Sequence, residues 1–117
     1  MRDNILLDKS KALALRIIRM YKYLCDEKKE FVLSKQVLRS GTSIGANARE
    51  ANRSQSSKEF IAKLNISLKE ADETLYWLEL LHESDYIDDE AFNSIYSDTE
   101  EVLKLLVSII KTSNAKK

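Results

Sequence analysis

The sequence predicts an all-α protein, a single domain folded as an antiparallel up-down-up-down four-helix bundle. Three observations lead to this prediction. Proline is absent and glycine occurs only twice in 117 residues, so the chain has few of the turn-forming residues that sheets and long loops require. Apolar residues recur at alternating spacings of three and four along four long segments, which is the period of amphipathic helices. The polar runs between these segments are short, and a short connector reaches only an adjacent antiparallel helix.

The first helix is expected at about residues 5–28, with Asp3 or Asn4 as its N-cap. Its apolar seam comprises Leu6, Ser10, Leu13, Ile17, Met20 and Leu24. The second helix is expected at about residues 34–53, with Ser34 as its N-cap. Its seam comprises Leu33, Val37, Ser40, Ile44, Asn47 and Ala51.

The third helix is expected at about residues 57–83, because Ser56 and Glu59 have the spacing of a capping box. Its seam comprises Phe60, Leu64, Ser67, Ala71, Thr74, Leu78 and Leu81. The fourth helix is expected at about residues 89–112, with Asp88 as its N-cap. Its seam comprises Phe92, Ile95, Thr99, Val102, Leu106 and Ile109.

Small and polar side chains are concentrated in the second helix, between Val37 and Ala51. Gly41 and Gly45 each cost about 1 kcal/mol of helix propensity, so we expect close approach of a neighbouring helix to compensate. The alternative is that Ser40, Gly41 and Thr42 break the helix in a loop. We predict packing or oligomer-interface roles for Ser40, Gly41, Ser43, Ile44, Gly45, Asn47 and Glu50. The polar members Ser40, Ser43, Asn47 and Glu50 either form a buried network that fixes helix register or line the oligomer interface. Tyr76 and Trp77 are expected in the core or at a subunit contact.

Charge is distributed unevenly along a chain whose formal net charge is zero. Residues 1–54 contain 12 Lys and Arg against 6 Asp and Glu, whereas residues 55–117 contain 7 against 13. Basic helices of this kind either bind a polyanion or pair with acidic helices, within the fold or between subunits. The cations proposed to contact nucleic acid are Arg16, Arg19 and Lys22 on the first helix and Lys35, Arg39, Arg49 and Arg53 on the second.

Other classes of protein are disfavoured by the composition. His82 is the only histidine and Cys25 the only cysteine, so we expect no catalytic site, no metal site and no cofactor. The di-iron bundle spacing Glu-x-x-His occurs once, at Glu79 and His82, whereas such a site requires two copies. No apolar run is long enough to span a bilayer, and no signal peptide is evident. We therefore expect a cytoplasmic protein.

Three motifs follow one another between Arg39 and Leu81. The pattern R-S-x-x-S-I-x-x-N-x-x-E-A begins at Arg39 and ends at Ala51. The pieces F-I-x-K-L, at residues 60–64, and K-E-A-x-E-T-x-Y-W-L, at residues 69–78, come after it. With these motifs the segment resembles the bacterial family of 23S rRNA intervening-sequence proteins, also called S23 proteins. The resemblance implies a four-helix bundle that assembles into a ring-like homo-oligomer, and it favours a homopentamer. The resemblance extends in fold to the accessory variability proteins of diversity-generating retroelements, which look like basic pentameric barrels that bind nucleic acid and a reverse transcriptase, and it thereby implies nucleic acid as a partner.

Two functions are therefore expected from the sequence. The first is a non-enzymatic, oligomeric scaffold that binds structured RNA or DNA through basic surfaces of the first two helices. The second is a structural or protein-interaction module that self-assembles without binding nucleic acid. Pairing of the arginines with carboxylates would favour the second function.

Overall fold

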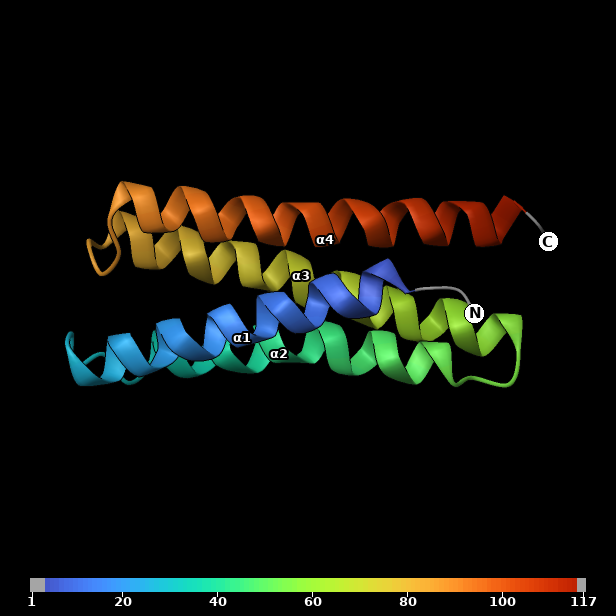
Figure 1. Ribbon diagram of the computed structural model, residues 1–117, viewed down its shortest axis with the longest axis horizontal. Helices are drawn as coiled ribbons and strands as arrows, with labels where there is room; N and C mark the ends of the chain where they lie inside the picture. Colours follow the sequence, from blue (N-terminus) through green and yellow to red (C-terminus); the bar gives the residue numbers. More distant parts are fainter. Residues whose placement is uncertain (1–3, 116–117) are drawn as a thin grey trace.

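Four helices form an antiparallel bundle in the computed structural model, which describes residues 4–115 (Figure 1). They are α1 (Ile5–Asp26), α2 (Leu33–Asn52), α3 (Ser57–Glu83) and α4 (Asp89–Ala115). The bundle measures 47 × 21 × 20 Å, and α1 begins at the end of the rod where α4 ends (Figure 1). The predicted fold class is confirmed, and α4 continues three residues beyond the expected end at 112. No helix within the described residues combines the length and apolar character needed to cross a membrane.

The core follows the predicted seams with small shifts along the helices. Met20 and Leu33 are only partly buried at its edge. Ala48 takes the buried position expected for Asn47, and Ile110 takes the one expected for Ile109. An ideal helix drifts by about 20° per heptad against a strict 4-3 repeat, which turns an extrapolated seam toward the next residue, although Ala51 at the end of the α2 seam is buried as expected.

Side-chain caps at three helix starts agree with the sequence. The Asn4 side chain accepts a hydrogen bond from the Leu7 amide at 3.2 Å, whereas the alternative cap Asp3 lies outside the described residues. Ser56 Oγ accepts from the Glu59 amide at 3.0 Å, and the Glu59 carboxylate accepts from the Gln55 amide at 3.0 Å. The corresponding bond at α4 joins the Asp88 carboxylate to the Ala91 amide at 2.8 Å.

The predicted cap of α2 is wrong. The carboxylate of Glu30, which is only 8% exposed, accepts hydrogen bonds from the amides of Val32, Leu33 and Ser34 at 3.1, 2.9 and 2.7 Å. Ser34 lies within the first turn, and its hydroxyl donates to the Glu30 carbonyl oxygen at 2.7 Å. The chain reverses at Lys29, which has a φ of 55°, and this turn brings Glu30 over the helix start.

The two glycines lie inside α2, so the loop alternative is excluded. A Cβ atom at Gly41 would lie 2.9 Å from both Cγ atoms of Ile17, and one at Gly45 would lie 3.2 Å from Ser10 Oγ. Both contacts are with α1, and that at Gly41 is the closer one. The expected close approach of a neighbouring helix is therefore present between α1 and α2. α1 and α4 are the least closely packed pair of adjacent helices.

Candidate nucleic-acid interface

Arg39 on α2 is neutralised by two carboxylates of α3. Its guanidinium donates to Glu70 Oε1 at 3.2 Å and also to the Glu73 carboxylate. Trp77 Nε1 donates to the same Glu73 carboxylate at 3.0 Å, which holds it in place. Two acidic groups surround one cation, so the local charge is negative and Arg39 is poorly placed to bind phosphate.

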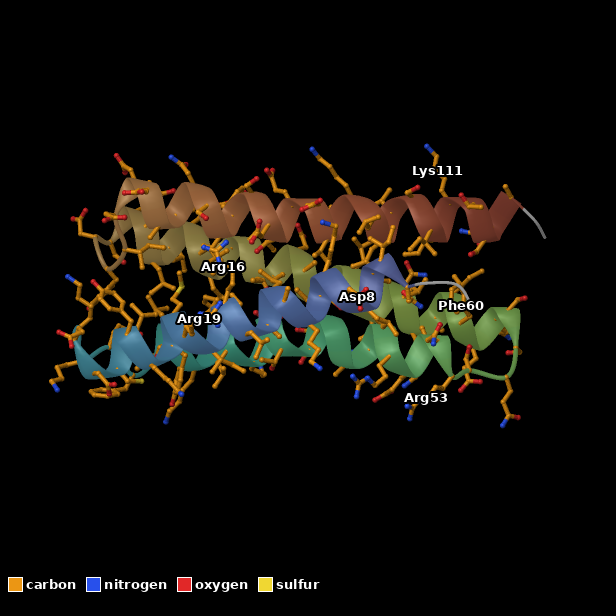
Figure 2. The ribbon with its side chains drawn as sticks, in the orientation of Figure 1. Asp8, Arg16, Arg19, Arg53, Phe60 and Lys111 are labelled. Carbon is orange, nitrogen blue, oxygen red and sulfur yellow. The ribbon has the colours of Figure 1, made fainter. Side chains whose placement is uncertain are left out.

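Arg16 on α1 is also engaged within the bundle. Its guanidinium donates to Asp98 Oδ2 at 2.6 Å and to Ser94 Oγ at 3.0 Å, both on α4. Figure 2 shows Arg16 directed from α1 toward the α3–α4 pair. Lys9 makes a second link between α1 and α4 through Glu101, at 2.9 Å. These two pairs link α1 to α4 across the surface of the bundle.

The other five predicted cations remain available to a ligand. These five are Arg19, Lys22, Lys35, Arg49 and Arg53. All five side chains are exposed, and none takes part in an ion pair within residues 4–115. Figure 2 shows Arg53 pointing away from the bundle on the α2 side. The sequence prediction is thus reduced from seven candidate residues to five, because the structure brings Arg16 and Arg39 to carboxylates.

Four of these cations, with Lys11, are exposed residues of α1 and α2 that helical spacing puts on one side of this helix pair. Lys11 and Arg49 line one hollow of about 380 Å³ between the two helices. Lys22 follows Ile17 by five residues and Lys35 precedes Gly41 by six. Because Ile17 and Gly41 are in contact and the two helices are antiparallel, Lys22 and Lys35 lie at about the same height along the bundle axis. We call this surface the α1–α2 basic face; its members are Lys11, Lys22, Lys35, Arg49 and Arg53.

Sequence reasoning missed Lys11. It precedes Lys22 by eleven residues, which is close to three helical turns and puts both on one side of α1. That spacing could have identified Lys11 as a member of the same basic surface as Lys22. The nearby carboxylate of Glu50 is occupied by Lys63 on α3, at 2.7 Å, and this hydrogen bond raises the pKa of Lys63.

The small polar residues of α2 act separately and do not form one buried network. Ser40 is fully buried and its hydroxyl bonds to that of Thr74 on α3, at 2.8 Å. Ser43 and Asn47 bond to carbonyl oxygens of α2 itself. Ile44 is fully buried, and its carbonyl oxygen accepts from the buried Ser67 hydroxyl at 2.7 Å. The expected network is therefore replaced by two hydroxyl contacts between α2 and α3.

Tyr76 and Trp77 differ in their surroundings. Tyr76 is 54% exposed, so it is not a core residue, and its role at a subunit contact stays a prediction. Trp77 is partly buried against the core. The rings of the two residues lie 5.2 Å apart.

The residues considered as catalytic groups or metal ligands, His82, Cys25 and Glu79, contact neighbouring side chains. His82 Nε2 lies 2.7 Å from Asp89 Oδ1, and its ring stacks on Phe92. Cys25 Sγ lies 3.8 Å from Ser34 Oγ. Glu79 accepts a hydrogen bond from the Tyr96 hydroxyl at 2.7 Å. Among residues 4–115, no three His, Cys, Asp or Glu side chains are grouped so that they could hold a metal ion.

The fold and this surface define an all-helical, single-domain up-down-up-down bundle with a basic face on its first two helices. The model of the 23S rRNA-intervening sequence protein family matches residues 2–108. The chain therefore belongs to that family, as its resemblance indicated. A crystal structure of a protein of unknown function from the S23 ribosomal protein family, from Bacteroides thetaiotaomicron VPI-5482, is 60% identical and superposes with a TM-score of 0.91. That match covers 92% of this chain and 99% of the other. No curated protein matches the chain.

Proposed function

We propose that this protein is a non-enzymatic, homo-oligomeric scaffold that binds structured RNA or DNA through the α1–α2 basic face. The observation that carries the proposal is the separation of charge in the folded chain. Lys9, Arg16 and Arg39 of α1 and α2 pair with carboxylates of α3 or α4, whereas the cations of the basic face have no such partner among the described residues. The bacterial cytoplasm is the setting that we propose for this function.

The dimensions of the face suit a nucleic-acid strand. Lys35 and Arg49 are 14 residues apart on α2, so they are separated by about 21 Å along the helix axis. One strand of a duplex rises about 3.4 Å per nucleotide, so this distance corresponds to roughly six nucleotides. A ring-like oligomer, for which we favour the pentamer, would repeat the face around its axis and multiply weak contacts. Phosphate charge and backbone shape would then dominate recognition over base sequence.

The family name supports nucleic acid as the partner, because it associates these proteins with sequences that interrupt 23S rRNA. The neutral formal charge of the chain limits the affinity of a single subunit, since the acidic α3 and α4 repel the same phosphates. Binding therefore depends on the orientation of α1 and α2 toward the ligand and on assembly.

A second function is supported by apolar side chains on the opposite helices. Ile66 and Tyr76 on α3 and Val107 on α4 are 42%, 54% and 42% exposed. Exposed apolar and aromatic groups are typical of protein contacts. We therefore retain the alternative that the chain is a structural or protein-interaction module that self-assembles and binds no nucleic acid.

Fluorescence anisotropy across a salt series distinguishes the two functions, using protein whose native mass has been measured. The probes are a structured ribosomal-type RNA hairpin and a DNA duplex. We expect affinity to fall steeply with salt, with a log–log slope of about −0.9 for each phosphate contacted on a duplex. Absence of binding at low salt would reject the scaffold and favour the alternative.

Two single substitutions on the same helix provide a matched comparison. Arg49→Gln removes a cation from the basic face, and Arg39→Gln removes one that is already paired with Glu70 and Glu73. Arg49→Gln should weaken binding and reduce the salt slope by about 0.9 per lost contact, whereas Arg39→Gln should leave the slope unchanged. Equal effects of both substitutions would show that the basic face is not the contact surface.

A further inference from the structure

A groove separates α1 from the beginning of α4, outside the basic face. It has a volume of about 420 Å³, which is within the range of about 300–1,000 Å³ that small-molecule sites occupy. Its walls are formed by Arg16, Arg19, Met20 and Tyr23 from one side and by Ile87, Asp88, Ala91 and Ile95 from the other. The ion pair of Arg16 with Asp98 links the two helices beside the groove.

The groove combines an apolar floor with a polar rim. Ile87 and Ile95 are 6% and 2% exposed and form the floor together with Met20. Tyr23 is 44% exposed and follows Arg19 by four residues, so the two side chains lie on one side of α1. Arg19 is exposed and makes no ion pair within residues 4–115.

A nucleotide has the three features that these groups would recognise. An aromatic side chain provides a stacking surface for any base, and the planar guanidinium of arginine binds phosphate with two hydrogen bonds. Asp88 uses one carboxylate oxygen to cap α4, which leaves the other free to accept from an exocyclic amine of a base. A lone phosphate would not need the apolar floor, and an uncharged apolar ligand would not need Arg19.

We propose that the α1–α4 groove binds one unpaired nucleotide of a structured nucleic acid, with its base against Tyr23 and Met20 and its phosphate at Arg19. This inference rests on the proposed function and specifies the part of the ligand that is recognised. Lys22, on the basic face, is three residues from Arg19, which is about 4.5 Å along the helix. A strand held on the basic face can therefore deliver a looped-out nucleotide across the exposed side of α1.

The test compares two hairpins with the same stem, one fully paired and one with a single bulged nucleotide, each made as RNA and as DNA. We expect the wild-type protein to bind the bulged hairpin more tightly by roughly 5- to 150-fold, which is the effect of stacking one base on an aromatic side chain. Tyr23→Ala should abolish this preference and leave affinity for the paired hairpin unchanged, whereas Tyr23→Phe should retain the preference. Tyr76→Ala, at the exposed tyrosine of α3, is the matched control and should behave as wild type.

The outcomes separate the groove from the basic face. Equal affinity of the wild-type protein for paired and bulged hairpins would overturn the groove assignment and leave the proposed function standing. An equal loss in Tyr23→Ala and Tyr76→Ala would also overturn it. Binding of neither hairpin would reject the proposed function, and the groove assignment with it. A 2-aminopurine placed at the bulge gives a second readout: its fluorescence should be quenched on binding wild-type protein and remain unquenched with Tyr23→Ala.

Discussion

Replacing Gly41 with alanine should destabilise this bundle, although the same change stabilises an isolated helix. Alanine has a helix propensity about 1 kcal/mol better than glycine. The added Cβ would lie 2.9 Å from Cγ1 and Cγ2 of Ile17, a side chain that is fully buried. Both Cγ atoms are bonded directly to the Ile17 Cβ, and an isoleucine side chain has one strongly preferred χ1 rotamer in a helix. The two atoms therefore cannot rotate away at low cost.

The net effect follows from these two contributions. Insertion of one carbon into a packed core costs about 1–3 kcal/mol. Subtracting the propensity gain leaves a net destabilisation of about 1 kcal/mol, or a decrease in Tm of about 4 °C for a domain of this size. The three atoms nearest to the added Cβ all belong to Ile17. In an Ile17→Ala background, Gly41→Ala should therefore stabilise the protein by about 1 kcal/mol.

Urea unfolding followed by circular dichroism measures this double-mutant cycle, at one protein concentration because assembly would shift apparent stability. The expected interaction energy between the two positions is about 2 kcal/mol. Gly45→Ala is the matched control, because its Cβ would lie 3.2 Å from Ser10 Oγ and 3.5 Å or more from the next atoms, a looser contact that a shift of a few tenths of an ångström relieves. We expect that control to be neutral or stabilising. If Gly41→Ala has the same effect in both backgrounds, the close-contact explanation is wrong.

Three further predictions concern single contacts. Glu30→Ala should destabilise the protein by about 1–2 kcal/mol in chemical unfolding, because the carboxylate caps the first turn of α2; an unchanged midpoint would dismiss this cap. Thr74→Val should cost about 1–3 kcal/mol, since it leaves the buried Ser40 hydroxyl without its partner, and adding Ser40→Ala should recover part of that loss. No recovery in the double variant would indicate that shape, and not the hydrogen bond, matters there. The hydrogen bond to the Glu79 carboxylate, with burial, raises the pKa of Tyr96 to about 12. The neutral phenol is the form stabilised on folding, so this contribution is present below pH 10 and is lost as pH rises toward 12. The stability difference between wild type and Tyr96→Phe should shrink over that interval, and a constant difference would contradict this assignment.

The helices and most of the core follow from local patterns in the sequence. The 3.6-residue period identified the buried side of each helix, and errors such as Asn47 in place of Ala48 are single-residue shifts in the direction of helix drift. The caps Ser56 and Asp88 act through bonds to amides three residues away, so spacing alone identifies them. The capping of α2 by Glu30 was not predicted, because the Glu30 carboxylate contacts the helix start only when Lys29 adopts a left-handed backbone conformation.

The candidate site was predicted less completely, because it depends on which helices are neighbours. Arg39 and Arg49 belong to the same basic strip in the sequence, yet only Arg39 lies toward the carboxylates of α3. Tyr23 acquires significance only when α4 is placed beside α1. A hydrophobic period identifies the buried side of a helix and does not state which neighbour covers each flank.

By itself, the sequence determined that the chain forms four amphipathic helices, where three of them are capped, and that its basic residues concentrate in the first two. Each of these properties depends on side chains separated by a few residues, whose relative positions are set by helix geometry. The tertiary structure decided which arginines are neutralised, that Gly41 is packed against Ile17, and that a groove lies between α1 and α4. These features depend on the order and separation of helices around the bundle, which arise from contacts between residues far apart in the chain.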